Sequence, residues 1–459
     1  MCLLRQLSDF FADIFTCIKT VRCIYRGSMN ITTYMRLFKM FAAAASAVFV
    51  FACNSSGAAC AAQNAAKASA SDSVEKNANA DKPERLFQDI KITHGPYVQS
   101  LTETSATVIW TTDCDAVSWV EIAPADGSHF YEKNRQKFYQ APLGRKLSGK
   151  LHSVKIDGLK PDTTYNYRVF STKVMCEDGE ATYYGFTAST RVYQKEPLKI
   201  KTLDTTKKSI AFSVLNDVHQ RVDFLNKMLA QISQDTDFLL LNGDMVNNMV
   251  CEEQIFKGFL DDVAKFCEGG MPMFFARGNH ETRGTFSGEY LKYFPTNTDK
   301  TYYTFRVGIV YFVVLDSGED KPDNDIEYFE RADFDNFRTQ QAKWLKSVVN
   351  SAEFKNAPVK ILISHIPPAW GDWHGSKDFQ KKFRDIVNGA KFSLIVSGHL
   401  HTYRGRGFEA SKELFNAYNV VNTNQEMLNI RVDENKISVD FVDVNGNKTL
   451  KSVNLDVKK

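Results

Sequence analysis

Between residues 208 and 405, short apolar runs alternate with longer stretches of helical periodicity. This alternation is typical of an α/β domain, in which buried strands and covering helices follow each other along the chain. We expect helices at 224–233 and 340–349, and further strands in the tail at 428–432, 437–444 and 449–455. The apolar runs expected to form the strands of the core are 210–215, 238–241, 273–275, 310–315, 361–363 and 394–396.

Five of these core strands end in a polar cluster. In open α/β sheets the loops beyond the carboxyl ends of the strands form the ligand crevice, so we expect the five clusters to meet at one edge. The clusters are Asn216-Asp217-Val218-His219, Asn242-Gly243-Asp244, Gly278-Asn279-His280-Glu281, Ser364-His365 and Gly398-His399-Leu400-His401.

The side chains of these clusters suit metal ions. Carboxylates and imidazoles without thiolates favour Zn, Mn or Fe. Six of the nine histidines lie between residues 219 and 401, and five of those six belong to the clusters. Seven candidate ligands exceed what one ion with open positions needs, and two divalent ions that share a carboxylate, about 3.5–4 Å apart, fit the number better. The candidate ligands are Asp217, His219, Asp244, Asn279, His365, His399 and His401.

In this order, the clusters resemble the five sequence blocks of the calcineurin-like metallophosphoesterases. The resemblance covers about residues 208–405. It implies two packed mixed sheets flanked by helices, with Asp244 bridging two metal ions. One ion is expected on Asp217, His219, Asp244 and His401, and the other on Asp244, Asn279, His365 and His399. His280 matches the family's histidine that stabilises or protonates the leaving group, and we expect Glu281 to orient that imidazole.

The preceding segment, residues 86–196, has the pattern of an all-β sandwich domain. Strand-like alternation at 106–110 and 165–169 is separated by turn residues at short intervals. The segment 158–165 resembles the turn and following strand of a fibronectin type III domain. The segment 95–99, followed by the strand that holds Trp110, resembles the N-terminal domain of purple acid phosphatases. The expected fold is therefore a β-sandwich followed by an α/β metallophosphoesterase domain at 205–459.

Two positions depart from the purple acid phosphatase pattern. The purple enzymes have a tyrosine three residues after the bridging aspartate, where this chain has Asn247. They have a glycine two residues after the first aspartate, where this chain has His219. The resemblance therefore lacks the ferric-tyrosinate ligand, and we expect a divalent metal pair and no purple colour.

The N-terminus has the design of an export signal. A basic region at 35–39 precedes an apolar run at 41–51. This run is shorter than the about 20 apolar residues that a membrane-spanning helix needs. Residues 50–53 resemble a bacterial lipobox, with Cys53 as the residue to be lipidated; a plain cleaved signal or a membrane anchor remains the alternative. We read 1–53 as a leader with its true start at Met29 or Met35, and 54–85 as a flexible tether. The expected location is periplasmic or cell-surface.

Other classes of protein lack support in the sequence. The net charge is only +3, so a nucleic-acid partner is not expected. No phosphate-binding GxxxxGK[ST] loop, GxSxG elbow or HExxH helix is present. The cysteines of the folded sequence leave two possibilities open, a Cys114–Cys176 or Cys251–Cys267 bridge, or four thiols.

The expected activity is hydrolysis of phosphate monoesters by a metal-bridging hydroxide, with a proton donated by His280. Two alternatives stay open: a phosphodiesterase that acts on a cyclic nucleotide or a phospholipid, and a non-catalytic surface binding protein. The physiological substrate and the oligomeric state stay undetermined. The candidate substrate contacts are Arg283, Trp373, His374 and Tyr403.

Overall fold

The computed structural model of the chain describes residues 90–191, 195–402, 415–450 and 452–457. These residues fall within one compact unit that starts at Arg85. The expected leader, the tether, the lipidation site Cys53 and the substrate candidate Tyr403 lie outside the described residues. Among the described helices, none combines the length and the apolar character that crossing a membrane requires.

An antiparallel β domain forms the N-terminal part and is organised by one long strand, β2. The first half of β2 pairs with β1 and β4, its second half pairs with β3 and β5, and the register shifts between Thr111 and Ala116. Because both sets of strands pair with the same strand, β2, hydrogen bonds connect all seven strands into one sheet. The strands are β1 (Ile92–Gln99), β2 (Ser105–Pro124), β3 (Lys137–Tyr139), β4 (Ser148–Asp157), β5 (Thr164–Asp178), β6 (Ala181–Ser189) and β7 (Leu198–Lys201).

The core of this domain lies around Trp110, which is fully buried. Its indole nitrogen donates a hydrogen bond of 2.9 Å to the hydroxyl of Ser171 on β5. A buried indole needs such a partner, because an unpaired N–H would cost free energy. The expected all-β domain is thus confirmed.

Two mixed sheets form the second part of the chain, as expected. In the six-stranded sheet, of order β10-β9-β8-β16-β17-β18, the first three strands are parallel and the last three antiparallel. In the five-stranded sheet, of order β11-β12-β13-β14-β15, only β11 is antiparallel. The strands are β8 (Ile210–Leu215), β9 (Phe238–Asn242), β10 (Met273–Ala276), β11 (Tyr303–Val307), β12 (Val310–Leu315), β13 (Val359–Ser364), β14 (Leu394–Ser397), β15 (Tyr418–Val421), β16 (Met427–Val432), β17 (Lys436–Val442) and β18 (Val453–Asp456).

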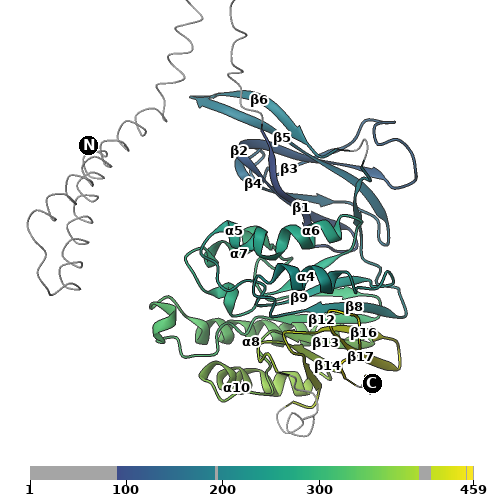
Figure 1. The fold of residues 1–459 in the computed structure, drawn as a ribbon, viewed down its shortest axis with the longest axis vertical. Coiled ribbons are helices and arrows are strands. Elements are labelled where there is room, and N and C mark those ends of the chain that lie inside the picture. Colours follow the sequence, from purple (N-terminus) through teal and green to yellow (C-terminus); the bar gives the residue numbers. More distant parts are fainter. Residues whose placement is uncertain (1–89, 192–194, 403–414, 451, 458–459) are drawn as a thin grey trace, which may run out of the picture. The chain divides into compact units, whose positions relative to one another are not determined.

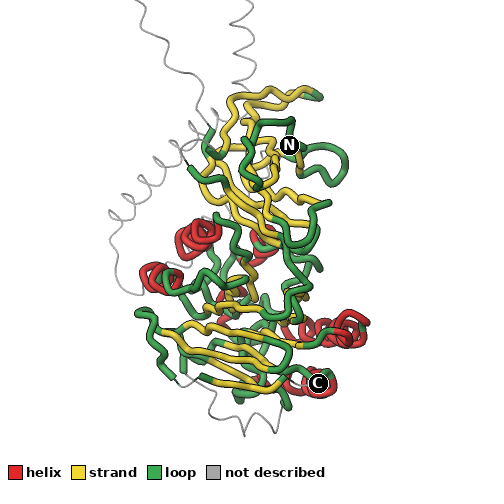
Figure 2. The backbone as a smooth tube through the Cα atoms, turned by 90° about the vertical axis from the view of Figure 1, so that its right-hand side faces the viewer, coloured by secondary structure: helices red, strands yellow, loops and turns green. Residues whose placement is uncertain are grey.

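Helices cover the outer face of each sheet. Figure 1 shows α4, α5, α6 and α7 on one side of the paired sheets and α8 and α10 on the other; Figure 2 shows the same part of the chain turned by 90°. The helices are α4 (Val222–Leu229), α5 (Glu252–Ile255), the π-helical turn η1 (Phe256–Leu260), α6 (Asp261–Cys267), the 3-10 turns η2 (His280–Thr282), η3 (Ser287–Glu289) and η4 (Ile326–Tyr328), α7 (Tyr290–Tyr293), α8 (Phe334–Asn350), α9 (Ala352–Asn356) and α10 (His374–Gly389).

The continuous apolar runs of the sequence are explained by burial on both faces. Along β9, Phe238 and Leu240 pack between the two sheets, whereas Leu239 and Leu241 pack under the helices α4 to α6. The five-stranded sheet alternates in the same way, and its outer residues pack against α8 and α10. Strands that are buried on both faces need apolar residues at every position.

The antiparallel domain packs on the helices of the first outer layer. The Tyr97 hydroxyl on β1 donates to the Tyr293 carbonyl oxygen at 2.9 Å. The imidazole of His94 stacks on Phe256 with ring centroids 4.2 Å apart, and its Nδ1 lies 3.0 Å from a carboxylate oxygen of Asp261. The α5–α6 region is therefore held from both sides, by the sheet below it and by β1 above it.

The cysteines form neither of the two bridges left open by the sequence. Cys114, Cys251 and Cys267 are free thiols. Burial raises the pKa of the Cys267 thiol to about 12, so it stays protonated and unreactive.

Candidate metal centre

The candidate ligands follow the carboxyl ends of parallel strands in both sheets. Asp217 and His219 follow β8, Asp244 follows β9, and Asn279 follows β10. From the other sheet, His365 follows β13, and His399 and His401 follow β14. The structure brings these side chains together, although we expected one edge of an open sheet and the clusters come from two packed sheets.

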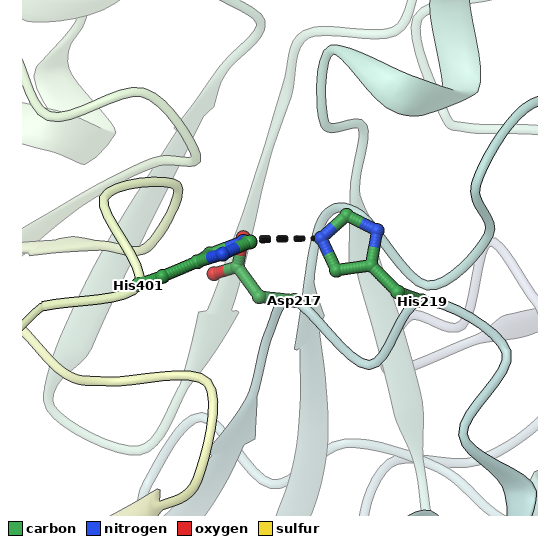
Figure 3. Close-up of side chains that lie close together, drawn as sticks. All are labelled: Asp217, His219 and His401. Atoms are coloured by element: carbon green, nitrogen blue, oxygen red, sulfur yellow. Dashed lines mark hydrogen bonds and ion pairs between the residues drawn. The ribbon is translucent and has the colours of Figure 1, made fainter.

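A first group consists of Asp217, His219 and His401, whose ligand atoms all lie within 4.8 Å of one another. Figure 3 shows the two imidazoles facing one another beside the Asp217 carboxylate. The Nε2 atoms of His219 and His401 are 3.1 Å apart, and the Nε2 of His401 is 3.0 Å from Asp217 Oδ1. Two imidazole nitrogens and a carboxylate oxygen that converge in this way are the donors of a cation site.

A second group consists of Asp244, His365 and His399. The Nε2 of His365 lies 3.0 Å from Asp244 Oδ2, and the Nδ1 of His365 lies 2.6 Å from the carbonyl oxygen of Asn242. Because a carbonyl oxygen only accepts hydrogen bonds, Nδ1 carries a proton and donates it to Asn242. The other ring nitrogen, Nε2, faces Asp244. Asn279 joins this group, because its side-chain amide lies 2.9 Å from the Nδ1 of His399 and 3.3 Å from Asp244 Oδ2.

Asp244 connects the two groups. It also belongs to a third set of close ligand atoms, with His219 and His280. Its carboxylate is thus the common neighbour of a histidine from the first group and of the histidines of the second. This is the position of a carboxylate shared by two ions.

The backbone at the ligands is strained. Five of the seven candidate ligands have a positive φ, which is uncommon for residues other than glycine: Asp217 (52°), His219 (49°), Asp244 (54°), His399 (70°) and His401 (52°). Such strain persists only where the surrounding structure imposes it, and it is typical of functional sites.

Glycine at position 278 permits the close approach of two ligand loops. A Cβ atom at Gly278 would lie 2.3 Å from Asp244 Oδ1 and 2.4 Å from the Asp244 nitrogen. A side chain therefore cannot be placed there without moving Asp244. Gly398 is similar, because its Cβ would lie 2.8 Å from Asp217 Oδ2.

The two buried carboxylates of the site, Asp217 and Asp244, lie beside its histidines. Asp217 and Asp244 are both fully buried, and burial acts to raise the pKa of Asp244. The charges of His365 and His280 nevertheless hold that pKa well below its usual value. Burial acts to lower the pKa of His365, but Asp244 outweighs it and raises the pKa to about 10. Among the described residues, the ion-pair partners of both buried carboxylates are histidines, which fits a site for divalent cations.

The contacts of Glu281 differ from those expected. We expected this carboxylate to orient His280; instead, it accepts hydrogen bonds from the backbone nitrogens of Asp244 (2.9 Å), Met245 (2.7 Å) and Gly278 (2.9 Å). The Nδ1 of His280 lies 2.6 Å from the carbonyl oxygen of Asn247. Glu281 therefore fastens the loop after β9 to the loop after β10, and burial raises the pKa of its carboxyl to about 7.

At position 247 the backbone carbonyl oxygen, and not the side chain, contacts His280. The Asn247 side chain, which stands where the purple enzymes have tyrosine, donates a hydrogen bond of 3.0 Å to Gln220 Oε1. Gln220 follows His219 and also has a positive φ of 58°. The side chains of Asn247 and Gln220 therefore tie the loops after β8 and β9 together.

Of the candidate substrate contacts, Arg283 is already paired. Its Nε and Nη2 atoms lie 2.6 and 2.9 Å from the two carboxylate oxygens of Glu319, which is fully buried. This bidentate pair neutralises the guanidinium. Arg283 thus forms an ion pair at the site rather than offering a free cation.

The other two described candidates lie at the start of α10. Trp373 is half exposed, and the ammonium group of Lys321 lies 5.5 Å from its ring centroid. His374 points its Nε2 toward the carboxylate of Asp335, 2.9 Å away, and it is not among the close ligand groups. The structure does not bring His374 to the metal centre.

Sequence reasoning missed two carboxylates, Glu319 and Asp320. They follow β12, and Asp320 Oδ2 lies 3.4 Å from the Nε2 of His399. The other clusters were predicted from polar residues that directly follow a strand end. These residues stand four and five positions beyond Leu315, so they do not read as part of the strand end.

Two family models match the chain. Residues 210–403 match the family described as calcineurin-like phosphoesterase, and residues 96–191 match the purple acid phosphatase N-terminal domain.

Purple acid phosphatase 23 of Arabidopsis thaliana is 21% identical over 384 residues, which cover 72% of this chain and 75% of that protein. Purple acid phosphatase 21 of the same plant is 23% identical over 302 residues, covering 60% of this chain and 59% of that protein. The human serine/threonine-protein phosphatase CPPED1 is 25% identical over 203 residues, covering 41% of this chain and 60% of that protein. The solved structure of PhoD aligns with a TM-score of 0.49 at 12% identity, covering 78% of this chain and 88% of that one.

Proposed function

Because the chain is a calcineurin-like metallophosphoesterase with a purple acid phosphatase N-terminal domain, we propose that it hydrolyses phosphate monoesters at a centre of two divalent metal ions. The single observation that carries this proposal is the convergence of donors from five strand ends on the Asp244 carboxylate. A closed structural site uses four donors around one ion, whereas these seven suit two ions with open positions.

The ligands divide into two sets. Asp217, His219, Asp244 and His401 would hold one ion, and Asp244, Asn279, His365 and His399 the other. When bound, the ions would supply Lewis acidity, which activates a water molecule and offsets the negative charge of the phosphate. We propose divalent ions because position 247 offers no tyrosine to a ferric ion.

His280 is the proposed proton donor to the leaving group. Its Nδ1 lies at the Asn247 carbonyl, and its Nε2 lies 3.9 Å from Asp244 Oδ2 on the side of the proposed metal pair. A histidine held through Nδ1 presents Nε2 in a fixed direction, where the protonated ring can donate to the departing oxygen. The imidazole is partly exposed, so a substrate can reach it.

The test is hydrolysis by the full chain after chelation. We expect the chelated protein to be inactive toward p-nitrophenyl phosphate and to recover when Mn²⁺, Zn²⁺ or Fe²⁺ is added singly. Asp244→Asn keeps the shape of the side chain but removes the shared charge, and it should not recover. The matched control is His129→Ala, at an exposed histidine of the antiparallel domain.

The outcome also distinguishes the alternatives. Faster hydrolysis of bis-p-nitrophenyl phosphate than of the monoester would replace the phosphatase with a phosphodiesterase. Absence of turnover with either ester in protein that binds two ions would favour a binding protein.

We also propose that the protein is exported and anchored by a lipid on Cys53, at the periplasmic or cell-surface face. The support is the basic region at 35–39, the apolar run at 41–51 and the lipobox-like residues 50–53. Metabolic labelling with palmitate in a bacterial host should label the wild-type chain but not Cys53→Ser. A wild-type chain without label would contradict the lipid anchor.

A further inference from the structure

His399 has a second contact that the two proposed metal sites do not use. Its Nδ1 lies 2.9 Å from the side-chain amide of Asn279, so this nitrogen belongs to the second ligand set. Its other ring nitrogen, Nε2, lies 3.4 Å from Asp320 Oδ2. The two nitrogens of His399 are thus divided between the ligand set and a carboxylate outside it.

Asp320 is buried, with 8% of its surface exposed. Its Oδ1 atom is also buried and has no hydrogen-bond partner among the described residues. A buried carboxylate is costly unless it is paired, and the imidazole of His399 is the partner within reach. The free-energy cost of burying the Asp320 carboxylate indicates that this side chain has a function at the site.

The backbone of Asp320 is held in place by two helices. At the start of α10, the Gly375 nitrogen donates to the Asp320 carbonyl oxygen at 2.6 Å. On α8, the fully buried Arg338 donates to the carbonyl oxygens of Ser317 and Glu319 at 3.0 and 3.1 Å. A Cβ at Gly375 would lie only 2.1 Å from the Glu319 carbonyl oxygen, so the contact with α10 is close. Asp320 is therefore fixed and does not belong to a loose loop.

We propose that Asp320 is the positioning residue of His399. Its carboxylate accepts the Nε2–H of the imidazole, fixes the tautomer with the lone pair on Nδ1, and directs that lone pair toward the second ion. This inference rests on the metal pair of the proposed function. Carboxylates in this position orient ligand histidines and increase their basicity, and their loss typically lowers metal affinity by about 10–100-fold.

The test is calorimetric titration of Mn²⁺ into the chelated full chain. We expect two binding events in the wild-type protein. In Asp320→Ala, one should keep its affinity and the other should weaken by about 10–100-fold. Asp320→Asn keeps an oxygen acceptor without the charge, so its loss should be smaller; if the alanine variant does not fold, this variant decides the question. The matched control is Asp325→Asn, on the same connection, whose carboxylate accepts from the Glu327 nitrogen and should leave both affinities unchanged.

The possible results are distinct. Two affinities equal to the wild-type values in Asp320→Ala would overturn the proposal, and so would an equal loss at both sites, which indicates a general structural defect. A wild-type protein that binds two ions but hydrolyses no ester contradicts the phosphatase and not the role of Asp320. A wild-type protein that binds no Mn²⁺ contradicts the metal centre and this inference with it.

Discussion

The Nδ1 atom of His280 lies 2.6 Å from the backbone carbonyl oxygen of Asn247. A carbonyl oxygen accepts but cannot donate, so Nδ1 carries a proton and donates it to this oxygen. The orientation of the imidazole therefore depends on the backbone of the loop after β9, the same loop that carries Asp244.

If His280 protonates the leaving group, its removal should matter most for poor leaving groups. We expect His280→Ala to lower the turnover of an alkyl phosphate by about 10²–10⁴-fold, the usual contribution of general acid catalysis. The loss for p-nitrophenyl phosphate should be smaller, because nitrophenolate departs without a proton. Initial rates for a series of esters of graded leaving-group pKa test this prediction. An equal loss for all esters would remove His280 from the role of proton donor.

Glu281 should affect stability and metal binding together. Glu281→Gln places an amide nitrogen among backbone N–H groups that now donate to the carboxylate. We expect the free energy of unfolding to fall by about 1–3 kcal/mol for each buried donor left unpaired, and metal affinity to fall because two ligand loops separate. Denaturant unfolding and Mn²⁺ titration measure the two effects. Lost turnover with unchanged stability would instead support the original expectation that Glu281 orients His280.

Gly278→Ala should disrupt the metal centre through sterics alone. The added Cβ would overlap the nitrogen and Oδ1 of Asp244, so the shared carboxylate must move. The matched control is Gly288→Ala, because a Cβ at Gly288 has no atom within 4 Å. Metal content after dialysis should fall in the first variant and match the wild type in the second. Two ions retained by Gly278→Ala would show that the ligand loops tolerate a wider spacing.

The chelated protein should lose stability as the pH rises. Burial, followed by the Asp244 charge, raises the pKa of Glu281 from 4.5 to about 7. Against its burial, the Asp244 charge raises the pKa of His365 from 6.5 to about 10. In both windows, pH 4.5–7 and 6.5–10, the folded chain binds more protons than the unfolded chain, so stability falls with increasing pH.

Thermal unfolding at pH 5, 7 and 9 measures this trend. The melting temperature of the chelated protein should decrease through the series. The decrease should be smaller with Mn²⁺, since the ion replaces the proton on His365 and binds more tightly at higher pH. A melting temperature that rises between pH 5 and pH 9 in the chelated protein would contradict the assigned pKa shifts.

Much of the fold could be predicted from the pattern of apolar runs. The strands expected at 210–215 and 310–315 coincide with β8 and β12, because a strand buried on both faces is apolar throughout. The strand β11 was missed, since Thr304 and Arg306 interrupt its apolar residues. The helix expected at 224–233 is α4, which ends at Leu229, because the chain turns there toward β9.

The candidate ligands could be predicted from the sequence because each follows a strand end and belongs to a block that resembles the family's pattern. The contacts that support the candidate ligands could not be predicted from the sequence. Asp320 and His399 are far apart in the sequence, and their contact depends on how α8 and α10 hold the connection after β12. The pairing of Arg283 with Glu319 likewise depends on packing, so the sequence could not show that this candidate substrate contact forms an ion pair.

The most direct test of the metal centre is anomalous X-ray diffraction from crystals of the full chain soaked with Mn²⁺. We predict two anomalous peaks about 3.5–4 Å apart, one on each side of the Asp244 carboxylate, with His219 and His401 at one and His365 and His399 at the other. A single peak, or two peaks that do not share Asp244, would contradict the dinuclear site on which the account depends.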